Sequence, residues 1–322
     1  MVRFGVIGAG SIARVFCEAV RGVQGNLYAV ASRDQKRSDE LKDAYGFEKA
    51  YDSYEKLLSD PLVDCVYLAT PHGLHYEQMM MILDYKKHIL CEKSFTLNAK
   101  QAAAVFKKAK ENNLFVMEAM WTRFLPTIKE VLVSVKNKMI GDITHLENSF
   151  GFSFENRDQS RLFDPKLGAG ALLDIGVYSV TMAHLFLGNP SHFDTEVILD
   201  PRGFDLSESI TFHYPDLDAH MSCSLESILD NECIITGTKG VIKIPQFWRA
   251  EKAYIYDLNH QLIKEIAHPH PINGFEFEIL EVIKCIESGL TESSTMTHQT
   301  TLDIMKLMDG LRYAWGLKYP QE

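Results

Sequence analysis

The chain has 322 residues, of which 46% are hydrophobic and 24% charged, a composition typical of globular proteins and unlike that of disordered, collagen-like or coiled-coil chains. At roughly 150 residues per domain, this length suggests two domains or one large one. With 33 basic against 43 acidic side chains the net charge is −10, which repels phosphate backbones and anionic lipid and argues against a nucleic-acid or membrane partner.

Up to about residue 117, short apolar runs alternate with longer amphipathic segments, which is the pattern of a parallel sheet covered by helices. We predict strands at residues 3–7, 26–31, 64–69, 87–90 and 114–117. We predict helices at residues 11–22, 34–45, 53–58, 74–85 and 98–112. Right-handed crossovers would wind these units into one open, doubly wound α/β sheet.

After Trp121 the pattern changes to short β-like segments separated by turns, which indicates an antiparallel sheet. The predicted strands cover residues 197–199, 209–213, 220–224, 233–237, 240–244 and 253–256. The predicted helices cover residues 126–136, 172–186, 274–288 and 297–315. We therefore expect a parallel α/β domain over residues 1–120 and an α+β domain over residues 121–322.

The sequence GAGSIA at residues 8–13 follows a predicted strand and opens a predicted helix, as a dinucleotide-binding turn does. Gly8 allows the tight turn, Gly10 lets the backbone approach a pyrophosphate, and Ala13 is the small residue where helix and strand pack. Ser11 and Ile12 begin the helix whose N-terminus faces the anion. The alternative is an ordinary strand-to-helix turn without a ligand.

The end of the second predicted strand distinguishes the two nicotinamide cofactors. Ser32 and Arg33 stand there, and arginine offers a planar set of donors that suits a 2′-phosphate. Asp34 is the competing signal, because a carboxylate at this point accepts hydrogen bonds from a ribose 2′-hydroxyl. We predict NADP and keep NAD as the alternative.

The next strand ends in ATPHGLH at residues 69–75, at the sheet edge where open α/β sheets bind ligands. Thr70, Pro71, His72 and His75 are therefore expected in a loop that touches the cofactor. Two histidines at this spacing also suggest a metal site. We predict no metal, because no further cluster of Cys, His or carboxylate residues with ligand spacing lies nearby.

Two more segments contain ionisable pairs. Glu92 and Lys93 end another predicted strand, where they are either a solvated pair or lie beside the nicotinamide. Asp174 and Tyr178, in GAGALLDIGVY, are four residues apart and would share one face of a helix. A phenol can shuttle a proton if a nearby ammonium lowers its pKa. The alternative is an N-terminal aspartate with a half-buried tyrosine.

These segments, in this order, resemble the Gfo/Idh/MocA family of pyridine-nucleotide oxidoreductases: GVIGAGSIA, ATPHGLHYEQ, CEKSFTLN and GAGALLDIGVY. MEAMWTRF and RLFDP, with Tyr178 where many members have histidine, are similar to the branch of dimeric dihydrodiol dehydrogenases and NADP-dependent D-xylose dehydrogenases. The resemblance covers essentially the whole chain. It implies a Rossmann domain followed by a domain with an open, mainly antiparallel sheet, whose face commonly pairs with a second subunit, and so a homodimer or higher homo-oligomer.

The resemblance also implies roles for single residues. It places the family lysine on Lys93, the helix aspartate on Asp174 and the branch's tyrosine on Tyr178. Tyr178 would take the hydroxyl proton, Lys93 would lower its pKa, and Asp174 would orient Lys93 or the substrate. Weaker candidates for the substrate pocket, which as aromatic or basic side chains could equally be structural, are Trp121, Arg123, Phe152, Arg161, Trp248 and Phe275.

One position departs from the family motif Glu-Lys-Pro. This chain has Ser94 where proline, often after a cis bond, is expected. The placement of Lys93 and the activity itself therefore stay open at this point.

The expected function is hydride transfer between NADP and a secondary alcohol of a sugar, polyol or vicinal diol. The alternatives are an NAD-dependent inositol-type dehydrogenase and a dinucleotide-binding regulator without catalysis, which Ser94 alone favours. Six cysteines without a CxxC pair suit the reducing cytoplasm. The first residues resemble no signal peptide and the apolar runs are shorter than the roughly 18 residues of a spanning helix, so we expect a soluble chain, complete from its first methionine.

Overall fold

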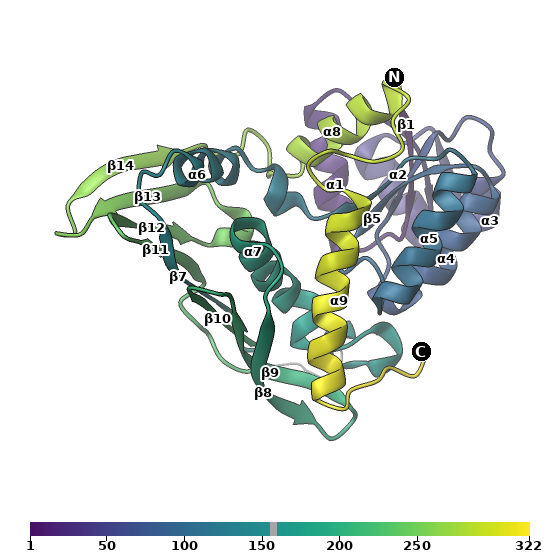
Figure 1. Cartoon of the computed structure of the whole chain (residues 1–322). Helices are drawn as coiled ribbons and strands as arrows, with labels where there is room; N and C mark the ends of the chain where they lie inside the picture. The colour runs from purple at the N-terminus through teal and green to yellow at the C-terminus, as the bar shows by residue number, and fades with distance from the viewer. Residues whose placement is uncertain (155–159) are drawn as a thin grey trace. The chain divides into compact units, whose positions relative to one another are not determined.

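The computed structural model describes residues 1–154 and 160–322 and divides into two compact units. Unit 1 comprises residues 1–121 and 270–302, and unit 2 comprises residues 122–269 and 303–322 (Figure 1). The change near residue 121 lies where the sequence pattern changes. Residues 270–302, which the sequence analysis placed in the second domain, pack with unit 1 instead.

Unit 1 is a Rossmann-type domain with a six-stranded parallel sheet in the order β3-β2-β1-β4-β5-β6. Its strands are β1 (Arg3–Ile7), β2 (Asn26–Ala31), β3 (Lys49–Tyr51), β4 (Cys65–Leu68), β5 (His88–Glu92) and β6 (Val116–Ala119). The chain reverses direction across the sheet after β3, so β1 and β4 flank a topological switch point. Open α/β sheets bind ligands at the carboxyl ends of the strands at such a point.

Three helices of unit 1, namely α2, α3 and α5, begin at a residue whose side chain caps the first turn. Asp34 and Asn98, both predicted helix starts, accept hydrogen bonds from the first-turn N–H groups of α2 and α5. The helices are α1 (Ser11–Gly22), α2 (Gln35–Tyr45), α3 (Tyr54–Leu58), α4 (His75–Asp84), α5 (Ala99–Glu111) and α8 (Glu276–Glu287). A short 3-10 turn, η1 (His72–Leu74), precedes α4.

Unit 2 has an eight-stranded sheet in the order β14-β13-β12-β11-β7-β10-β9-β8. Its strands are β7 (Ile143–Gly151), β8 (His192–Asp200), β9 (Phe204–His213), β10 (Asp218–Ser224), β11 (Glu232–Gly237), β12 (Gly240–Pro245), β13 (Lys252–Asp257) and β14 (Leu262–Ala267). Neighbouring strands are antiparallel except β7 and β10, which are parallel. This confirms the mainly antiparallel sheet.

One face of this sheet is covered by α7 (Val177–Leu187) and the π turn η6 (Leu172–Gly176), which contact β7, β9 and β10 (Figure 1). Helix α6 (Pro126–Lys136) packs against β13 and β14. Helix α9 (His298–Ala314) begins in unit 1 and ends in unit 2. Among the described residues, the helical stretch 165–187 is long and apolar enough to cross a membrane, and 78% of its apolar window is buried, as in a core helix.

The structure corrects several predicted elements. Strands β3, β7 and β14 were not predicted, β8 and β9 are longer than expected, and β6 lies two residues later. In β7 the buried positions Leu146, Asn148 and Phe150 alternate with polar outward positions. Because a buried asparagine interrupts the apolar period, the sequence does not read as a strand. The helix predicted from residue 172 begins as a π turn rather than an α-helix.

Candidate active site

The glycine turn lies between β1 and α1, at the switch point of the sheet. Gly8 has a φ of +101°, and a Cβ there would lie 2.8 Å from the Ala69 carbonyl oxygen, so only glycine fits. A Cβ on Gly10, by contrast, would meet no described atom within 4 Å. Ser11 opens α1 at the surface, and Ala13 is fully buried where the helix meets the sheet. Open space beside a helix N-terminus suits a diphosphate, so this turn fits a dinucleotide.

The end of β2 brings together the groups predicted to select the cofactor. Ser32 is buried, and its Oγ accepts a hydrogen bond from Asp34 N at 3.3 Å. The Asp34 carboxylate caps α2 by accepting from Lys36 N at 3.0 Å, which is a structural role. Arg33 is exposed. The geometry thus explains Asp34 without a ribose contact and favours a 2′-phosphate near Ser32 and Arg33.

Arg37 is a functional candidate that the sequence analysis did not select. Its Nη2 donates to the Ala9 carbonyl oxygen at 3.1 Å, so the guanidinium lies against the glycine turn. Burial raises the pKa of the Tyr54 phenol, and the nearby guanidinium groups of Arg33 and Arg37 oppose that shift. Two cations therefore converge at this strand end. Helical spacing gives no signal for this pair, because Arg33 precedes the Asp34 cap and only Arg37 lies in α2.

The histidines after β4 join two loops of unit 1. His75 Nε2 lies 2.7 Å from Thr70 O, and its Nδ1 lies 3.0 Å from Ser94 O. His72 Nδ1 lies 3.3 Å from Lys93 O, and both rings are buried. Ring nitrogens that face carbonyl oxygens hold the loop after Pro71 against the loop after β5. Within residues 1–154 and 160–322, no group of three or more Cys, His or acidic residues could hold a metal ion.

Lys93 follows β5, and the residue before it is held by a hydrogen bond from β4. Glu92 is only 7% exposed and accepts a hydrogen bond from Tyr67 Oη at 2.5 Å, so it is not half of a solvated pair. The Tyr67 ring stacks on Phe16 with ring centroids 3.7 Å apart. The peptide bond between Lys93 and Ser94 is cis. Lys93 itself is half-buried.

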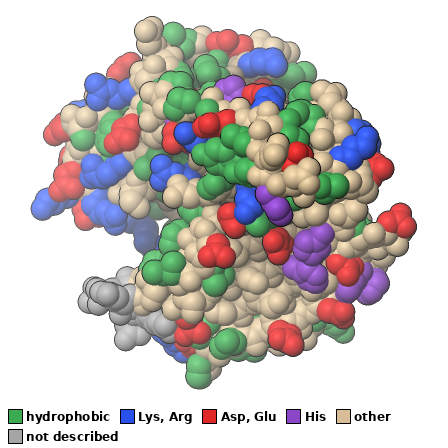
Figure 2. Space-filling model, turned by 90° about the vertical axis from the view of Figure 1, so that its left-hand side faces the viewer, with side chains coloured by type: hydrophobic (Ala, Val, Ile, Leu, Met, Phe, Trp, Pro, Cys, Tyr) green, Lys and Arg blue, Asp and Glu red, His purple; other side chains and the backbone are tan. Residues whose placement is uncertain are grey.

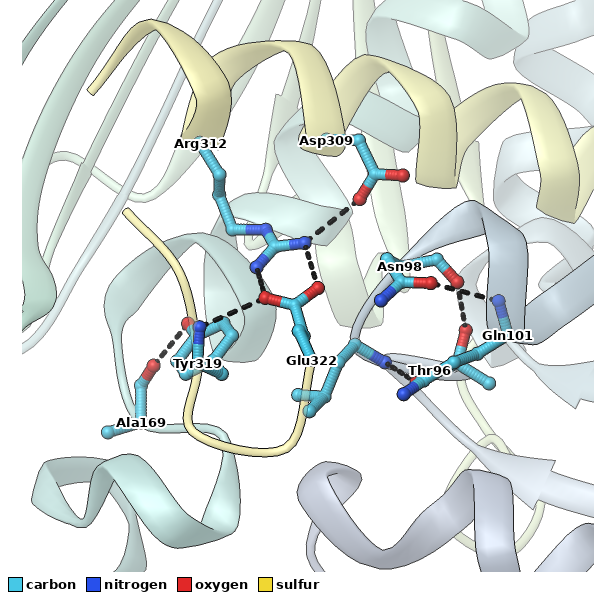
Figure 3. Close-up of polar contacts among 9 residues, drawn as sticks. Thr96, Asn98, Gln101, Ala169, Asp309, Arg312, Tyr319 and Glu322 are labelled. Carbon is cyan, nitrogen blue, oxygen red and sulfur yellow. Dashed lines mark hydrogen bonds and ion pairs between the residues drawn. The ribbon is translucent and has the colours of Figure 1, made fainter. Parts of the chain in front are cut away.

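The chain after Lys93 is also fixed. Phe95 N donates to Glu118 Oε1 at 3.1 Å, and Thr301 Oγ1 donates to Glu118 Oε2 at 3.0 Å. Directly after Phe95, Thr96 Oγ1 donates to Asn98 O at 2.8 Å, and Gln101 N donates to Asn98 Oδ1 at 2.9 Å (Figure 3). Sequence reasoning missed Tyr67 and Glu118, which support the lysine loop from β4 and β6.

In unit 2, Asp174 and Tyr178 lie on the helix that follows the glycine turn 168–170. Asp174 is 9% exposed, and its Oδ1 accepts from Arg161 Nη2 at 3.0 Å. Tyr178 is 7% exposed and meets Phe150 edge-on, with ring centroids 5.8 Å apart. Asp174 lies inside the π turn, and single π turns are frequent at functional sites. Asp174 therefore forms an ion pair with Arg161, a contact that the sequence did not indicate.

The predicted substrate residues fall into two groups. Phe152 and Trp248 surround Phe150, which stacks on Trp248 at 4.0 Å and meets Phe152 edge-on at 5.1 Å. This cluster belongs to unit 2, as do Arg161 and Arg123. Trp121 and Phe275 pack together in unit 1, with ring centroids 4.9 Å apart. Phe150, central to the unit 2 cluster, was not predicted.

Comparisons with known proteins match both units of the chain. Residues 2–120 match the family model described as "Oxidoreductase family, NAD-binding Rossmann fold", and residues 128–243 match "GFO/IDH/MocA C-terminal domain". The trans-1,2-dihydrobenzene-1,2-diol dehydrogenase of Xenopus tropicalis is 31% identical, over 99% of both chains. The scyllo-inositol 2-dehydrogenase (NADP(+)) IolU of Bacillus subtilis is 30% identical, over 100% of this chain and 99% of the relative.

A solved structure matches equally widely. A mutant of the 3-ketoreductase KijD10 from Actinomadura kijaniata, in complex with TDP-benzene and NADP, superimposes with a TM-score of 0.88. It is 25% identical and 97% of each chain is covered. The similarity therefore extends over both units of the chain.

Proposed function

The chain belongs to the Gfo/Idh/MocA family of NAD-binding oxidoreductases, and from this premise we propose that it oxidises a secondary alcohol of a sugar, polyol or vicinal diol with NADP. The glycine turn carries the proposal. The open space over Gly10, beside the N-terminus of α1, suits a diphosphate. A turn with a purely structural role would not require this open space. Full-length relatives that act on a dihydrodiol and on scyllo-inositol support the substrate class.

The residues that would hold the cofactor are those of unit 1. The backbone of the glycine turn would bind the diphosphate, and Ser32, Arg33 and Arg37 would bind the 2′-phosphate. The loop from Thr70 to His75 and the segment at Glu92 would border the nicotinamide end. When bound, NADP takes up the hydride from the carbinol carbon.

For the proton, we propose Tyr178 as the general base. The Tyr178 oxygen would accept the proton of the substrate hydroxyl as the carbinol carbon loses its hydride, and a carbonyl would remain. Lys93 would lower the pKa of the phenol through its positive charge. Asp174, whose Oδ1 accepts a hydrogen bond from Arg161 Nη2 at 3.0 Å, would orient Lys93 or the substrate.

A substrate panel tests the proposal directly. The purified protein is mixed with NADP or NAD and with aldoses, inositols and vicinal diols, and reduced nicotinamide is followed by absorbance. Turnover of one of these classes with NADP is expected. Turnover of inositol with NAD alone would favour the NAD-dependent alternative. NADPH binding without turnover in any well would favour a regulator, with Ser94 the first position to examine.

Replacement of Arg33 by alanine is expected to weaken NADP binding by roughly 10- to 100-fold, since a charge-assisted bidentate contact is among the stronger hydrogen bonds. Affinity for NAD should change by less than about twofold, because NAD has no 2′-phosphate. Titration of both cofactors by fluorescence measures the two changes. Lys36→Ala, at the next exposed cation on α2, is the matched control. Equal loss for both cofactors would refute the NADP assignment.

We also propose that two copies pair through the uncovered face of the unit 2 sheet. The side chains there include the half-buried or exposed apolar residues Ile234, Val241, Tyr254, Tyr256 and Leu262. In Figure 2 the side of the molecule that lies on the left in Figure 1 faces the viewer. Histidine and acidic side chains gather on this side. On the sheet, His213 bonds Asp218 at 2.7 Å and Asp194 at 2.9 Å. A face with both charges and apolar groups can be self-complementary in a two-fold pair.

Sedimentation analysis tests the pairing. At micromolar concentration the wild-type mass is expected to be twice the 36.6 kDa of one chain. Ile234→Glu should give the single-chain mass, because its carboxylate would face the copy next to Glu147, its cross-strand neighbour. A wild-type protein that sediments as a single chain would contradict the proposal.

We place the protein in the cytoplasm, and the support is the state of its cysteines. All six are free and buried. Burial raises the pKa of the Cys17 thiol to about 12, so it stays protonated and unreactive at neutral pH. Such thiols need no oxidising compartment.

A further inference from the structure

The helix that carries Asp174 and Tyr178 receives its cap from a distant strand. Ala171 occupies the N-cap position, and its methyl group cannot accept a hydrogen bond. Asp205, on β9, supplies the acceptor: its Oδ2 accepts from Leu172 N at 2.5 Å. The Asp205 side chain is fully buried.

The turn before the helix is shaped around this carboxylate. Gly170 has a φ of +118°, and a Cβ there would lie 2.3 Å from Asp205 Oδ1, so no larger residue leaves room for the cap. On the other side of the turn, Tyr319 Oη donates to Ala169 O at 2.6 Å (Figure 3). Both Asp205 and Tyr319 therefore hold the start of the helix.

The charges around Asp205 determine when it is an anion. Desolvation raises the pKa of Asp205 to about 6, opposed by hydrogen bonds from the Leu172 and Ala171 backbone and by the charge of Arg312. Burial, and after it the charge of Asp205, raises the pKa of Glu208 well above its usual range.

The remaining neighbours do not compete for this role. Burial raises the pKa values of the Cys223 thiol and the Tyr319 phenol well above their usual ranges, so both are uncharged at neutral pH. Arg312 is bound by Glu322 at 2.7 Å and by Asp309 at 3.0 Å (Figure 3). The titratable groups that face Asp205 from β9, β10, α9 and the C-terminal segment are Glu208, Cys223, Arg312 and Tyr319. Among these groups, Asp205 is the one whose side chain accepts a hydrogen bond from the first turn of the helix, at Leu172 N.

We propose that Asp205 is a positioning residue for the reaction, which as an anion fixes the first turn of the helix and thereby places Asp174 and Tyr178. A hydrogen bond to a charged acceptor is roughly twice as strong as a neutral one, and a negative charge is favourable at a helix N-terminus. Protonation of Asp205 loosens this turn without removing the side chain. The inference rests on the proposed roles of Asp174 and Tyr178.

Asp205→Asn tests the charge alone, because the amide oxygen can still accept from Leu172 N. At pH 8, kcat should fall about tenfold while the dissociation constant for NADPH stays the same. A carboxyl group with a raised folded-state pKa opposes folding when ionised, and that opposition disappears as the pH falls below about 6. The variant should therefore have a Tm at pH 8 no lower than that of the wild type.

The pH dependence separates positioning from a general structural role. The ratio of wild-type to variant kcat should fall from about ten at pH 8 to near one at pH 5, with its midpoint at about 6. Glu208→Gln is the matched control: it replaces a neighbouring buried acid that does not cap the helix by an amide of the same size, so kcat should stay within about twofold at every pH. A ratio that does not change with pH, a parallel fall in Tm and kcat, or the same profile in Glu208→Gln would refute the proposal.

A second readout does not depend on turnover. After correction for intrinsic exchange rates, hydrogen exchange at the Leu172 amide should be more protected at pH 8 than at pH 5 in the wild type and unchanged with pH in Asp205→Asn. Equal protection at both pH values in the wild type would overturn the capping role. Absence of turnover in the wild type would instead refute the proposed function, while the exchange measurement still decides whether Asp205 fixes the turn.

Discussion

Replacement of Lys93 by methionine is expected to lower kcat by a factor of about 1,000 while the dissociation constant for NADPH changes by less than about fivefold. Methionine keeps much of the length of the side chain and removes its charge. If the ammonium lowers the pKa of the Tyr178 phenol, its loss leaves the phenol protonated and unable to accept the substrate proton. Steady-state absorbance measures kcat, and quenching of protein fluorescence measures cofactor binding.

The substitution of Lys93 should leave the surrounding backbone in place, because the residues near it are held by other contacts. Tyr67 holds the neighbouring Glu92 at 2.5 Å, and Glu118 holds Phe95 at 3.1 Å, so neither anchor depends on the lysine side chain. Lys110→Met, at an exposed lysine of α5, is the matched control and should leave kcat unchanged. Near-normal turnover in Lys93→Met would exclude Lys93 from proton transfer. A large loss of NADPH affinity would make it a binding residue instead.

The sequence predicts the architecture where structure is decided locally. In unit 1 the strands are largely apolar runs and three of the helices begin at side-chain caps, so period and capping locate most of these elements. The three-residue β3 is too short to show a period. In unit 2, the buried Asn148 interrupts the alternation of apolar and polar residues along β7. The return of residues 270–302 to unit 1 follows from tertiary packing, which no local pattern encodes.

The same limit applies to the candidate site. The glycine turn could be predicted because its chemistry lies within six consecutive residues, and the structure shows why Gly8 must be glycine. Arg37, Tyr67 and Asp205 could not, since each acts on a partner 25 or more residues away in the sequence. Spacing identifies neighbours on one helix or strand, but it cannot show which strand lies beneath a helix end.

Replacement of Tyr178 by phenylalanine is expected to lower kcat by a factor of about 100 to 1,000, because the general base is lost while other contributions to catalysis remain. The ring's edge-on contact with Phe150, at 5.8 Å between centroids, does not use the hydroxyl. The variant should therefore fold normally and bind NADPH with unchanged affinity. Any pH dependence of kcat that arises from the phenol should disappear. Tyr313→Phe, at a phenol that is 89% exposed on α9, is the matched control and should be fully active.

Combining the two substitutions decides whether Lys93 and Tyr178 act in one step. If Lys93 works by lowering the pKa of the Tyr178 phenol, it has no group left to act on once the hydroxyl is gone. The double variant should then be no more than about twofold slower than Lys93→Met alone, a strongly non-additive result typical of residues that act as a unit. Independent roles would instead multiply the two losses. A fully additive double variant would therefore contradict the proposed proton transfer even if each single variant were slow.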